Sequence, residues 1–498
     1  MNLSERELSP VICFQFTSNS IHLAASLEIL ESLVKENKTS IQYYWLGSST
    51  SYPSTMSRGL DRPFRKVGVF PKSIKRALLT MNSSNIKMYS RFSKKTNISS
   101  SLDALMAQCK NYISIQDLSN LEDNGISPGG AIVNSFVSET GRWTIEYPRD
   151  ESLLRLLITS YLEIYHAVIQ ILEEEKPTAV VIYNGRFLHE RATWDACRRL
   201  GVDVHLFETT RNRFHVRVNH GFHDRILNQK MMKEFWSLRE KEMDSELIEQ
   251  LGSKYFLDLE SNKNLFYSKE SLRNLRESYF VYYSNSDDEA IGFWESWRTT
   301  SFSQIEIIQL LQKLFETEEN SHLYVRLHPN LANKSKEEQD RWRVLKNSSS
   351  TTIIWETEKF SSYQLLKGAK GVISFGSTIG LEAAFHMIPS AILADCWYDE
   401  LDVADKLKSF EELVNWIEFV KEGVDQQLLV QRKRNSLIRG LWLEMAGSPF
   451  MNCKITEIRW GSWEATHYKH VKLQRIGLKV FFSILNNKLK RLRRGLKP

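Results

Sequence analysis

The feature that most constrains the fold of this chain is a regular alternation of short apolar runs with longer amphipathic segments. Short apolar runs bounded by turn-forming residues predict buried strands, and apolar residues recurring every three or four positions predict helices. In the first half, the predicted strands are 11–16, 41–47, 179–183 and 202–207, and the predicted helices are 23–34, 151–175 and 187–200. A strand, a helix and a second strand in succession form the building unit of a parallel sheet.

The same alternation returns in the second half of the chain. Its predicted strands are 278–284, 322–328, 350–356, 371–375 and 389–395, and its predicted helices are 304–315, 362–368 and 378–386. Alternation in both halves predicts an α/β protein with two Rossmann-like domains that face each other across a cleft. Ligands of such domains bind beyond the carboxyl ends of the strands.

The periodicities also set the expected domain limits. They predict an N-terminal domain at 1–230 and a C-terminal domain at 276–440, joined by a charged helical connector at 231–275. Residues 441–498 are expected to form a crossover and a basic helical tail. Residues 51–130 are rich in Ser, Asn and Lys, and predict loops and short helices.

Positive charge is concentrated at the C-terminus. The formal net charge is +6, and the stretch from Ala465 to Pro498 holds ten Lys or Arg and no Asp or Glu. Removing those ten leaves 56 basic against 60 acidic residues, so the body of the chain does not suit nucleic acid. Because Leu, Ile, Val and Phe alternate with the basic residues, the tail is expected to contact a membrane interface as an amphipathic helix. The alternative is a solvated basic helix that folds back on the N-terminal domain.

The N-terminus and the cysteines indicate the compartment. No basic segment precedes the apolar run at 11–16, and no window reaches the roughly 18 apolar residues of a membrane span. The five cysteines are scattered and contain no CxxC pair, which fits reduced thiols and excludes an ordinary thiolate zinc site. We therefore expect a cytoplasmic protein, with the tail at the inner face of the cytoplasmic membrane.

The most informative segment for chemistry is SFGSTIGLEAAFHMIPSAIL, at 374–393. A buried strand ends there, and Gly376, Ser377 and Thr378 form a tight turn into a helix. The first amides of a helix and the positive end of its dipole suit a phosphate. Glu382 lies one turn into the helix, on the face expected to meet the hydroxyls of a ribose. The alternative is a plain helix capped by Ser or Thr.

A second segment, RLHPN, ends the strand predicted at 322–328. Pro329 stops the strand and fixes the direction of the chain before it. His328 is therefore expected at the strand tip, where it can donate to a nucleotide phosphate or base. Arg326 precedes it by two residues on the same strand face and is expected to support it. The alternative is an ordinary loop histidine.

The N-terminal domain offers candidates for the acceptor side. Asn184, Gly185 and Arg186 fall at a strand tip before a helix, and Arg186 and Arg191 can engage an anionic group. Glu208 ends the next predicted strand and is the leading candidate for a general base. An ion pair with a nearby arginine, or a helix cap, is the alternative for Glu208.

RLHPN followed by SSYQLLKGAKGVISFGSTIGLEAAFHMIPSAIL resembles the C-terminal domain of bacterial capsule-polysaccharide glycosyltransferases of the GT-B fold. The likeness covers about 278–400, and VYYSNSDDEAI at 281–291 resembles the opening strand and loop of that domain. A His-Pro pair and a Ser-Ser or Ser-Thr pair recur in inverting enzymes that use CMP-sugars, such as Kdo-transferring capsule enzymes and bacterial sialyltransferases. The resemblance implies that His328, Ser377 and Thr378 hold the nucleotide and its phosphate.

The resemblance implies an inverting glycosyltransferase that moves a sugar from a nucleotide-sugar, with CMP-Kdo favoured, to a capsule or lipopolysaccharide-type glycan. Its partners would be the nucleotide-sugar donor and a glycan or lipid-linked glycan acceptor. Teichoic-acid polymerases that use CDP-glycerol carry similar motifs, so a CDP-glycerol-type glycerophosphotransferase is an alternative. A non-catalytic GT-B-like partner in a polysaccharide assembly complex is another.

Two further expectations concern a second acid and metal ions. Sialyltransferases place an acidic pair before Gly in their base motif, and Glu122-Asp123-Asn124-Gly125 is similar but interposes Asn124. Asp123 is therefore a second candidate base, with a surface turn as its alternative. The histidines at 189–223 lack the spacing of a zinc helix, and 287–289 suits a helix start. GT-B enzymes generally use no bound metal, so we expect neither a metal nor a cofactor.

Overall fold

The computed structural model describes residues 9–16, 19–37, 39–46, 72–81, 86–90, 92, 97–140, 142–210, 213–264, 275–285, 303–318, 320–334, 336–358, 360–458 and 463–473. The chain forms two compact units, which are treated separately. Unit 1 comprises Met1–Glu139, Trp143–Phe222 and Gly447–Pro498, and unit 2 comprises Thr140–Arg142 and His223–Ala446. The main change of unit therefore falls between 222 and 223.

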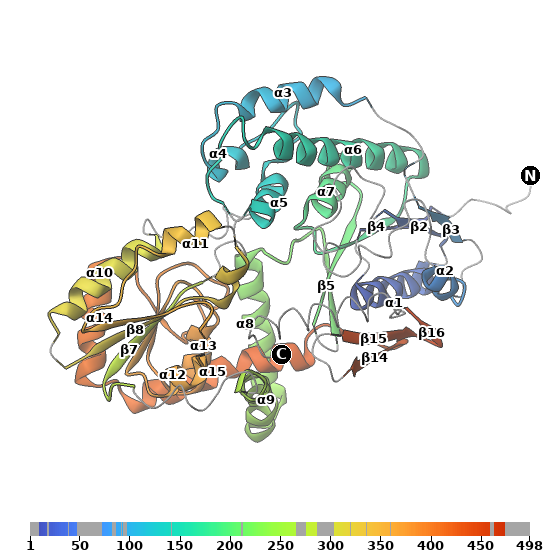
Figure 1. Ribbon diagram of the computed structural model, residues 1–498. Helices are drawn as coiled ribbons and strands as arrows, with labels where there is room; N and C mark the ends of the chain where they lie inside the picture. The colour runs from blue at the N-terminus through green and yellow to red at the C-terminus, as the bar shows by residue number, and fades with distance from the viewer. Residues whose placement is uncertain are drawn as a thin grey trace, which may run out of the picture. The chain divides into compact units, whose positions relative to one another are not determined.

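Unit 1 is built on a seven-stranded sheet with the order β13-β6-β5-β4-β1-β2-β3 (Figure 1). Its strands are β1 (Val11–Gln15), β2 (Ile41–Trp45), β3 (Ile86–Tyr89), β4 (Ala179–Tyr183), β5 (Val204–Thr209), β6 (Arg213–Val218) and β13 (Ser448–Pro449). The five strands from β5 to β3 are parallel, and β6 and β13 join antiparallel. Strands β1 and β4 are buried throughout, as expected for a sheet covered on both faces.

The helices of unit 1 are α1 (Ser20–Asn37), α2 (Lys72–Leu78), α3 (Ser99–Cys109), α4 (Ile115–Ser119), α5 (Gly129–Thr140), α6 (Glu151–Glu175) and α7 (Leu188–Leu200). Among the described residues, α6 alone has the length and apolar composition of a membrane span, and 56% of that stretch is buried. Because α6 packs along α7 and α3, it is a core helix of this unit. All five cysteines are free thiols.

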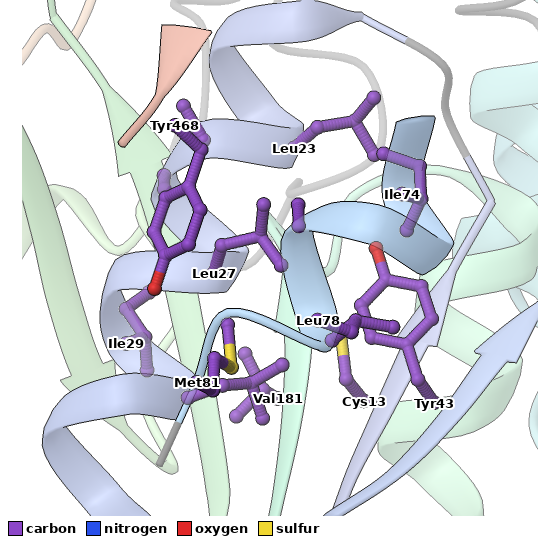
Figure 2. Close-up of a cluster of buried hydrophobic side chains, with 14 of the residues drawn as sticks. Cys13, Leu23, Leu27, Ile29, Tyr43, Ile74, Leu78, Met81, Val181 and Tyr468 are labelled. Atoms are coloured by element: carbon purple, nitrogen blue, oxygen red, sulfur yellow. The ribbon is translucent and has the colours of Figure 1, made fainter. Parts of the chain in front are cut away.

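A small antiparallel sheet completes unit 1. It consists of β14 (Cys453–Ile458), β15 (Trp463–Tyr468) and β16 (Val471–Lys472), and it packs on α1. Figure 2 shows the core beneath it, where Tyr468 joins Leu27 and Ile29 of α1, and Ile74 and Leu78 of α2. The chain therefore returns from unit 2 to close the apolar core of unit 1.

Unit 2 is built on a six-stranded parallel sheet with the order β12-β11-β10-β7-β8-β9 (Figure 1). Its strands are β7 (Tyr279–Tyr283), β8 (His322–Arg326), β9 (Thr351–Ile354), β10 (Gly371–Ser374), β11 (Ser390–Ile392) and β12 (Asp405–Lys406). Its helices are α8 (Arg225–Glu242), α9 (Ser245–Asn264), α10 (Gln304–Glu316), the 3₁₀ helix Pro329–Asn333, α11 (Lys336–Trp342), α12 (Ser362–Lys367), α13 (Ile379–Phe385), α14 (Phe410–Glu422) and α15 (Gln426–Met445).

Both sheets have the strand order of the Rossmann fold. Numbered along the chain within each unit, the parallel strands run 3-2-1-4-5 in unit 1 and 3-2-1-4-5-6 in unit 2. The predicted fold class, two Rossmann-like α/β domains as in the GT-B fold, is therefore confirmed. In each sheet, the second and third strands lie on one side of the first strand, and the fourth and later strands lie on its other side. The switch points, β1 with β4 and β7 with β10, are where such folds bind ligands.

The structure departs from the sequence predictions at two strands of the large sheet and in the C-terminal segment. Residues 441–498 were predicted as a crossover and a basic helical tail, but Cys453–Ile458, Trp463–Tyr468 and Val471–Lys472 form antiparallel strands, because Tyr468, Val471 and Leu473 are buried in the core of unit 1. Residues 86–89 were predicted as loop or short helix, which is wrong, because they form the edge strand β3. The strand β6 at 213–218 was not predicted, and it extends the sheet antiparallel to β5. The predicted acidic group at 287–289 and the tail from 474 lie outside the described residues.

Candidate functional site

In unit 2, the chain segments that leave β7 and β10 meet at the carboxyl edge of the sheet. Ser284 and Asn285 follow β7, and the turn Phe375–Thr378 follows β10. Asn285 Nδ2 donates to the carbonyl oxygen of Phe375 at 3.2 Å, so the two strand ends are tied together. This is the switch point of the sheet, and the motif singled out in the sequence lies directly on it.

The turn after β10 depends on a glycine. Gly376 has φ +77°, and a Cβ added there would lie 3.3 Å from the backbone oxygen of Asp395. Tyr398, which is fully buried, donates its hydroxyl to the carbonyl oxygen of Ser377. A Cβ on Gly380 would lie 2.7 Å from that same hydroxyl, so α13 packs closely on it. The turn is therefore held in one conformation by a left-handed glycine and a buried phenol.

The two hydroxyl residues of the turn are open to a ligand. Ser377 is half-buried and Thr378 is exposed. Their carbonyl oxygens accept from the amides of Gly380 and Leu381, at 3.1 Å each. Within the part of the chain that the structure describes, the amides of Ser377 and Thr378 donate to no protein acceptor. The two amides and the Ser377 hydroxyl form a set of donors at one turn that suits a phosphate.

Glu382 lies beneath this turn. It is buried, and its carboxylate accepts from the hydroxyl of Tyr363 and from Thr378 Oγ1, the latter at 3.3 Å. Thr378 makes no side-chain capping bond to its helix, so the arrangement differs from a plainly capped helix. The contacts show Glu382 holding the Thr378 hydroxyl in place, and its ribose contact stays a prediction.

The tip of β8 carries His328, which is half-buried. Its backbone N–H donates to Ser284 Oγ at 2.8 Å, and its Nδ1 accepts from the amide of Asn330 at 3.2 Å. An accepting Nδ1 places the proton of the neutral ring on Nε2, which makes Nε2 a donor. Since β7 lies between β8 and β10, His328 and the Ser377 turn are two strands apart, about 10 Å. That spacing suits the two ends of a nucleotide.

Arg326 and Pro329 have structural positions beside His328. Arg326 is almost fully buried, and its guanidinium donates to the carbonyl oxygens of Trp355 at 2.6 Å and Glu358 at 3.3 Å. These bonds fix the segment that follows β9. Pro329 is exposed and begins the short 3₁₀ helix after His328. Both residues therefore shape the tip that presents His328.

In unit 1, the corresponding tip follows β4. Asn184 has φ +50° and Gly185 has φ +76°, so two consecutive residues adopt the left-handed conformation. A Cβ on Gly185 would lie 2.6 Å from Leu206 Cδ2 and 2.9 Å from Trp194 Cε3. A side chain at 185 is thus excluded by both conformation and space. The turn brings the amide of Asn184 to the end of β5.

Glu208, near the end of β5, is the acid that this turn holds. Its Oε1 accepts from the hydroxyl of Tyr183 at 3.0 Å and from the amide of Thr209 at 3.1 Å, and its Oε2 accepts from Asn184 Nδ2. Burial raises the pKa of Glu208 above its usual range, although these donors and Arg186 lower it. From the described residues, Oε1 receives two donors and Oε2 one, so Oε2 keeps a lone pair for a further proton.

Two aromatic residues that the sequence did not single out support Glu208. His22 of α1 stacks on Tyr183, with ring centroids 3.9 Å apart and an interplanar angle of 20°. Burial lowers the pKa of His22 to about 3, so the ring is neutral. Burial and the carboxylate of Glu208 raise the pKa of Tyr183, which keeps its hydroxyl as a donor. No local motif marks His22, because it is one histidine on an apolar helix face.

A second buried acid lies in the same region. Glu190, in the first turn of α7, is fully buried, and burial raises its pKa to about 8. It is near enough to Tyr183 to raise the pKa of that phenol. Glu190 was missed in the sequence because it lies among the charged residues of a helix whose opposite face is polar. Unit 1 therefore holds two carboxyl groups whose neutral forms are favoured by burial.

The predicted arginines differ in position. Arg186 is near Glu208, whose pKa it lowers, and its Nε donates to Asn134 Oδ1 at 3.5 Å. Arg191 instead pairs with Asp195 at 3.0 Å on its own helix, and Asp195 also accepts from the hydroxyl of Tyr161 at 2.7 Å. The structure thus brings Asn184, Arg186 and Glu208 together, and it places Arg191 in the contact between α7 and α6.

Asp123 lies in a tight turn. Asp123 and Ile126 exchange backbone hydrogen bonds of 2.9 and 2.8 Å, around Asn124 and Gly125 with φ +50° and +77°. Such a pair is the two-residue turn of a hairpin. A Cβ on Gly125 would lie 3.7 Å from a guanidinium nitrogen of Arg199, at the end of α7. Because α7 runs back from the tip of β4, this turn lies toward the opposite edge of the sheet from Glu208.

Within the described residues, no group of three or more His, Cys, Asp or Glu side chains has the arrangement of a metal site.

Comparisons with known proteins give a limited result. No protein-family model and no curated protein matches the chain. Among solved structures, the KpsC β-Kdo 2,4 transferase of Thermosulfurimonas dismutans aligns with 52% of this chain and 80% of its own, at 14% identity and a TM-score of 0.34. The MnaA–UDP structure of S. aureus aligns with 88% of this chain and 94% of its own, at 10% identity and a TM-score of 0.34. The UDP-GlcNAc 2-epimerase of Neisseria meningitidis, bound to UDP-GlcNAc, aligns with 87% of this chain and 99% of its own, at 12% identity and a TM-score of 0.31. With TM-scores this low, these likenesses assign no chemistry to the chain.

Proposed function

We propose that this chain is an inverting glycosyltransferase that moves a sugar from a nucleotide-sugar, with a CMP-sugar such as CMP-Kdo favoured, to a growing capsule or lipopolysaccharide-type glycan. One observation carries the proposal. At the switch point of unit 2, a histidine donor on β8 and an open Ser-Thr turn after β10 flank the tip of β7. This is the arrangement that the motif resemblance implies for a nucleotide site.

The nucleotide-sugar would bind unit 2 at two places, the turn at Ser377 and Thr378 and the side chain of His328. The amides of Ser377 and Thr378 and the hydroxyl of Ser377 would hold the phosphate, and His328 Nε2 would donate to the phosphate or the base. Tyr398 and Glu382 would keep the turn in its binding conformation through the Ser377 carbonyl and the Thr378 hydroxyl. No metal or cofactor is needed in this scheme, because the donors at the turn neutralise the leaving phosphate.

The acceptor would bind unit 1 near Asn184 and Arg186, and Glu208 would act as the general base. In one displacement, the acceptor hydroxyl oxygen forms a bond to the anomeric carbon while the bond from that carbon to the donor phosphate breaks. The nucleotide leaves with the bonding electron pair, and the hydroxyl proton passes to Glu208 Oε2. Attack from the face opposite the leaving group inverts the anomeric configuration. Burial strengthens Glu208 as a base.

The proposal extends to location. The basic, apolar-rich stretch from Ala465 to Pro498 would contact the inner face of the cytoplasmic membrane, where a lipid-linked acceptor is found. A glycerophosphotransferase that uses CDP-glycerol needs the same phosphate turn and is the second candidate. The third candidate is a non-catalytic assembly partner. We disfavour it because the pKa of Glu208 is raised and its Oε2 keeps a lone pair that can take a proton.

Isothermal titration calorimetry with CMP, CDP, UDP and GDP tests the proposal on the wild type, His328→Ala and a control, His220→Ala. His220 is exposed and lies after β6. We expect tight CMP binding that is lost in His328→Ala and kept in the control. A preference for CDP would favour the glycerol-transferring alternative, and a preference for UDP or GDP would overturn the CMP-sugar donor. Binding of no nucleotide would contradict an enzymatic role.

A further inference from the structure

A cluster of charged and polar side chains lies at the carboxyl ends of β11 and β12 in unit 2. Lys406, the last residue of β12, pairs through Nζ with Asp395 Oδ1 at 2.5 Å and with Asp399 Oδ2 at 2.8 Å. Arg225, the first residue of α8, pairs with Asp399 at 3.3 Å. Gln229, one turn further along α8, also donates to Asp399. We call these five residues the β11 cluster.

The buried contacts of the β11 cluster do not depend on Asp395. The side chain of Asp399 has no exposed surface, and it binds both cations of the cluster as well as Gln229. The side chain of Asp395 is 23% exposed. Its Oδ2 lies 3.9 Å from Arg225 Nη2, which is beyond hydrogen-bonding distance. Among the described residues, Oδ2 of Asp395 therefore accepts no hydrogen bond and remains available as an acceptor.

Asp395 lies directly beside the turn that is proposed to hold the phosphate. The amide of Leu393 donates to the carbonyl oxygen of Ser374 at 3.0 Å, which keeps the end of β11 paired with the end of β10. A Cβ added to Gly376 would lie 3.3 Å from the carbonyl oxygen of Asp395. The turn and the available carboxylate oxygen therefore belong to the tips of adjacent strands, which are about 5 Å apart.

The strand order indicates which part of a nucleotide-sugar would reach Asp395. β10 lies between β7 and β11, and β8, which carries His328 at its tip, lies on the other side of β7. A nucleotide with its phosphate at the turn after β10 and its base toward His328 therefore extends over the tip of β7. The sugar is joined to the phosphate on the side away from the ribose, so it extends toward the tip of β11, where Asp395 lies.

We propose that Asp395 is a specificity-determining residue that binds the sugar of the donor, with Oδ2 accepting hydrogen bonds from sugar hydroxyls. The inference rests on the proposed transferase function and deepens it, because it names a residue that distinguishes a nucleotide-sugar from the free nucleotide. Lys406 is a positioning residue, since its pairing with Oδ1 fixes the carboxylate. A hydroxyl that donates to a carboxylate forms a short and strong hydrogen bond.

Competition binding on the full-length chain tests the proposal. Free CMP and CMP-Kdo each displace a fluorescent CMP derivative, and fluorescence anisotropy gives the Kd of both. In Asp395→Asn the amide oxygen is expected to stay on Lys406, so the amide nitrogen takes the place of Oδ2 and cannot accept a hydrogen bond. We expect the affinity for CMP-Kdo to fall by roughly 10- to 100-fold, the range for losing a hydrogen bond to a charged group, while the affinity for CMP is unchanged.

Two further comparisons separate sugar binding from charge and from structure. Asp402→Asn makes the same charge change at an exposed residue between β11 and β12, and it is expected to keep both wild-type affinities. Lys406→Gln is expected to weaken CMP-Kdo binding without weakening CMP binding. Lys406→Arg keeps a cation beside Asp395 and is expected to restore most of the affinity for CMP-Kdo.

An unchanged ratio of the two affinities in Asp395→Asn would overturn the proposal, because Oδ2 would then make no contact with the sugar. Equal losses for CMP and CMP-Kdo would also overturn it, since Asp395 would then only support the phosphate turn. A loss of the same size in Asp402→Asn would assign the effect to net charge and have the same consequence. A wild type that binds neither CMP nor CMP-Kdo would instead overturn the transferase function, so the two failures are distinguishable.

Discussion

The two switch points share a strand order and differ in what they place at the strand tips. In unit 2 the tips carry hydroxyls, amides and a histidine donor, with Ser377 half-buried and Thr378 exposed. In unit 1 they carry a half-exposed acid, Glu208, held by Tyr183 and Asn184, and a second acid, Glu190, that is fully buried. The same scaffold therefore presents hydrogen-bond donors at the strand tips of one unit and carboxyl groups at those of the other.

The difference follows from the turn that leaves each fourth strand. After β10, one left-handed glycine leads through Ser377 and Thr378, whose amides have no acceptor among the described residues, into a helix. After β4, two left-handed residues, Asn184 and Gly185, bend the chain toward the end of β5 and bring an amide donor to Glu208. Burial then favours the protonated form of each acid in unit 1.

The largest effect is expected at Glu208. Glu208→Gln removes the proposed base and keeps the shape of the side chain and the hydrogen bonds from Tyr183 and Thr209, although its amide nitrogen cannot accept from Asn184. We therefore expect kcat to fall by about 10²- to 10⁴-fold. CMP affinity is expected to be unchanged, because Glu208 is in unit 1. Steady-state kinetics and calorimetry measure the two quantities, with the exposed Glu36→Gln as control. A kcat close to that of the wild type would remove Glu208 from the chemistry.

The second effect concerns stability at Glu190. Its pKa is about 8 when folded, against an ordinary value near 4.5, so the folded state retains a proton that the unfolded state loses between these values. Stability of the wild type is therefore expected to fall as pH rises from about 4.5 to about 8. Glu190→Gln removes this loss and is expected to be more stable by about 1–3 kcal/mol at pH 7.

Urea unfolding across that pH range measures the difference between wild type and Glu190→Gln. The gap is expected to close toward pH 4.5, where the carboxyl is neutral in both states. A gap that is independent of pH, or a less stable variant at pH 7, would show that Glu190 is ionised or specifically bound in the folded protein.

The third effect separates backbone strain from binding at Gly376. Gly376→Ala forces a side chain into the left-handed region, which costs roughly 1–2 kcal/mol, and sets its Cβ 3.3 Å from a backbone oxygen. Gly201→Ala is a matched control, because Gly201 has φ +68° and nothing lies within 4 Å of its added Cβ. Both variants are expected to lose stability in urea, and only Gly376→Ala to lose CMP affinity. If Gly376→Ala and Gly201→Ala bound CMP equally well, the turn at Gly376 would not be part of the nucleotide site.

The smallest effects are expected on removing either of two buried tyrosine hydroxyls, those of Tyr183 and Tyr363. Tyr183→Phe removes a donor to Glu208, which raises the pKa of that acid and moves the acidic limb of the kcat–pH profile to higher pH. Tyr363→Phe removes a donor to Glu382 in unit 2 and is expected to weaken CMP binding severalfold while leaving that limb in place. If both variants shifted the acidic limb of the kcat–pH profile, or neither did, the assignment of the base to unit 1 and of the nucleotide to unit 2 would be wrong.

Much of the fold could be predicted because its elements have strong local patterns. The strands at 179–183 and 371–374 and the helix at 151–175 are long apolar runs or clear periodicities, and they lie where the sequence predicts. The strands β3 and β6 could not be predicted, because both are partly exposed and their residues carry no apolar run. β3 is an edge strand, and β6 is followed only by the two-residue β13. Their pairing depends on the completed sheet.

The site was only partly predictable for a related reason. Gly376, Ser377 and His328 lie in short motifs at strand ends, so their position follows from the strands. His22 and Tyr183 act on Glu208 through contacts between segments far apart in the chain, which no local pattern encodes. Arg191 is the opposite case, because the sequence predicts it in the site but the structure pairs it with Asp195 on the same helix, which competes with a role there.

We propose that the nucleotide binds unit 2 and that the base lies in unit 1. The most direct test is CMP calorimetry on His328→Ala, Glu208→Gln and the wild type. We expect His328→Ala to lose CMP affinity, and Glu208→Gln to retain it while losing transfer activity. Equal CMP affinities in both variants, or a wild type that binds no CMP, would contradict the assignment of the nucleotide to unit 2 and of the base to unit 1.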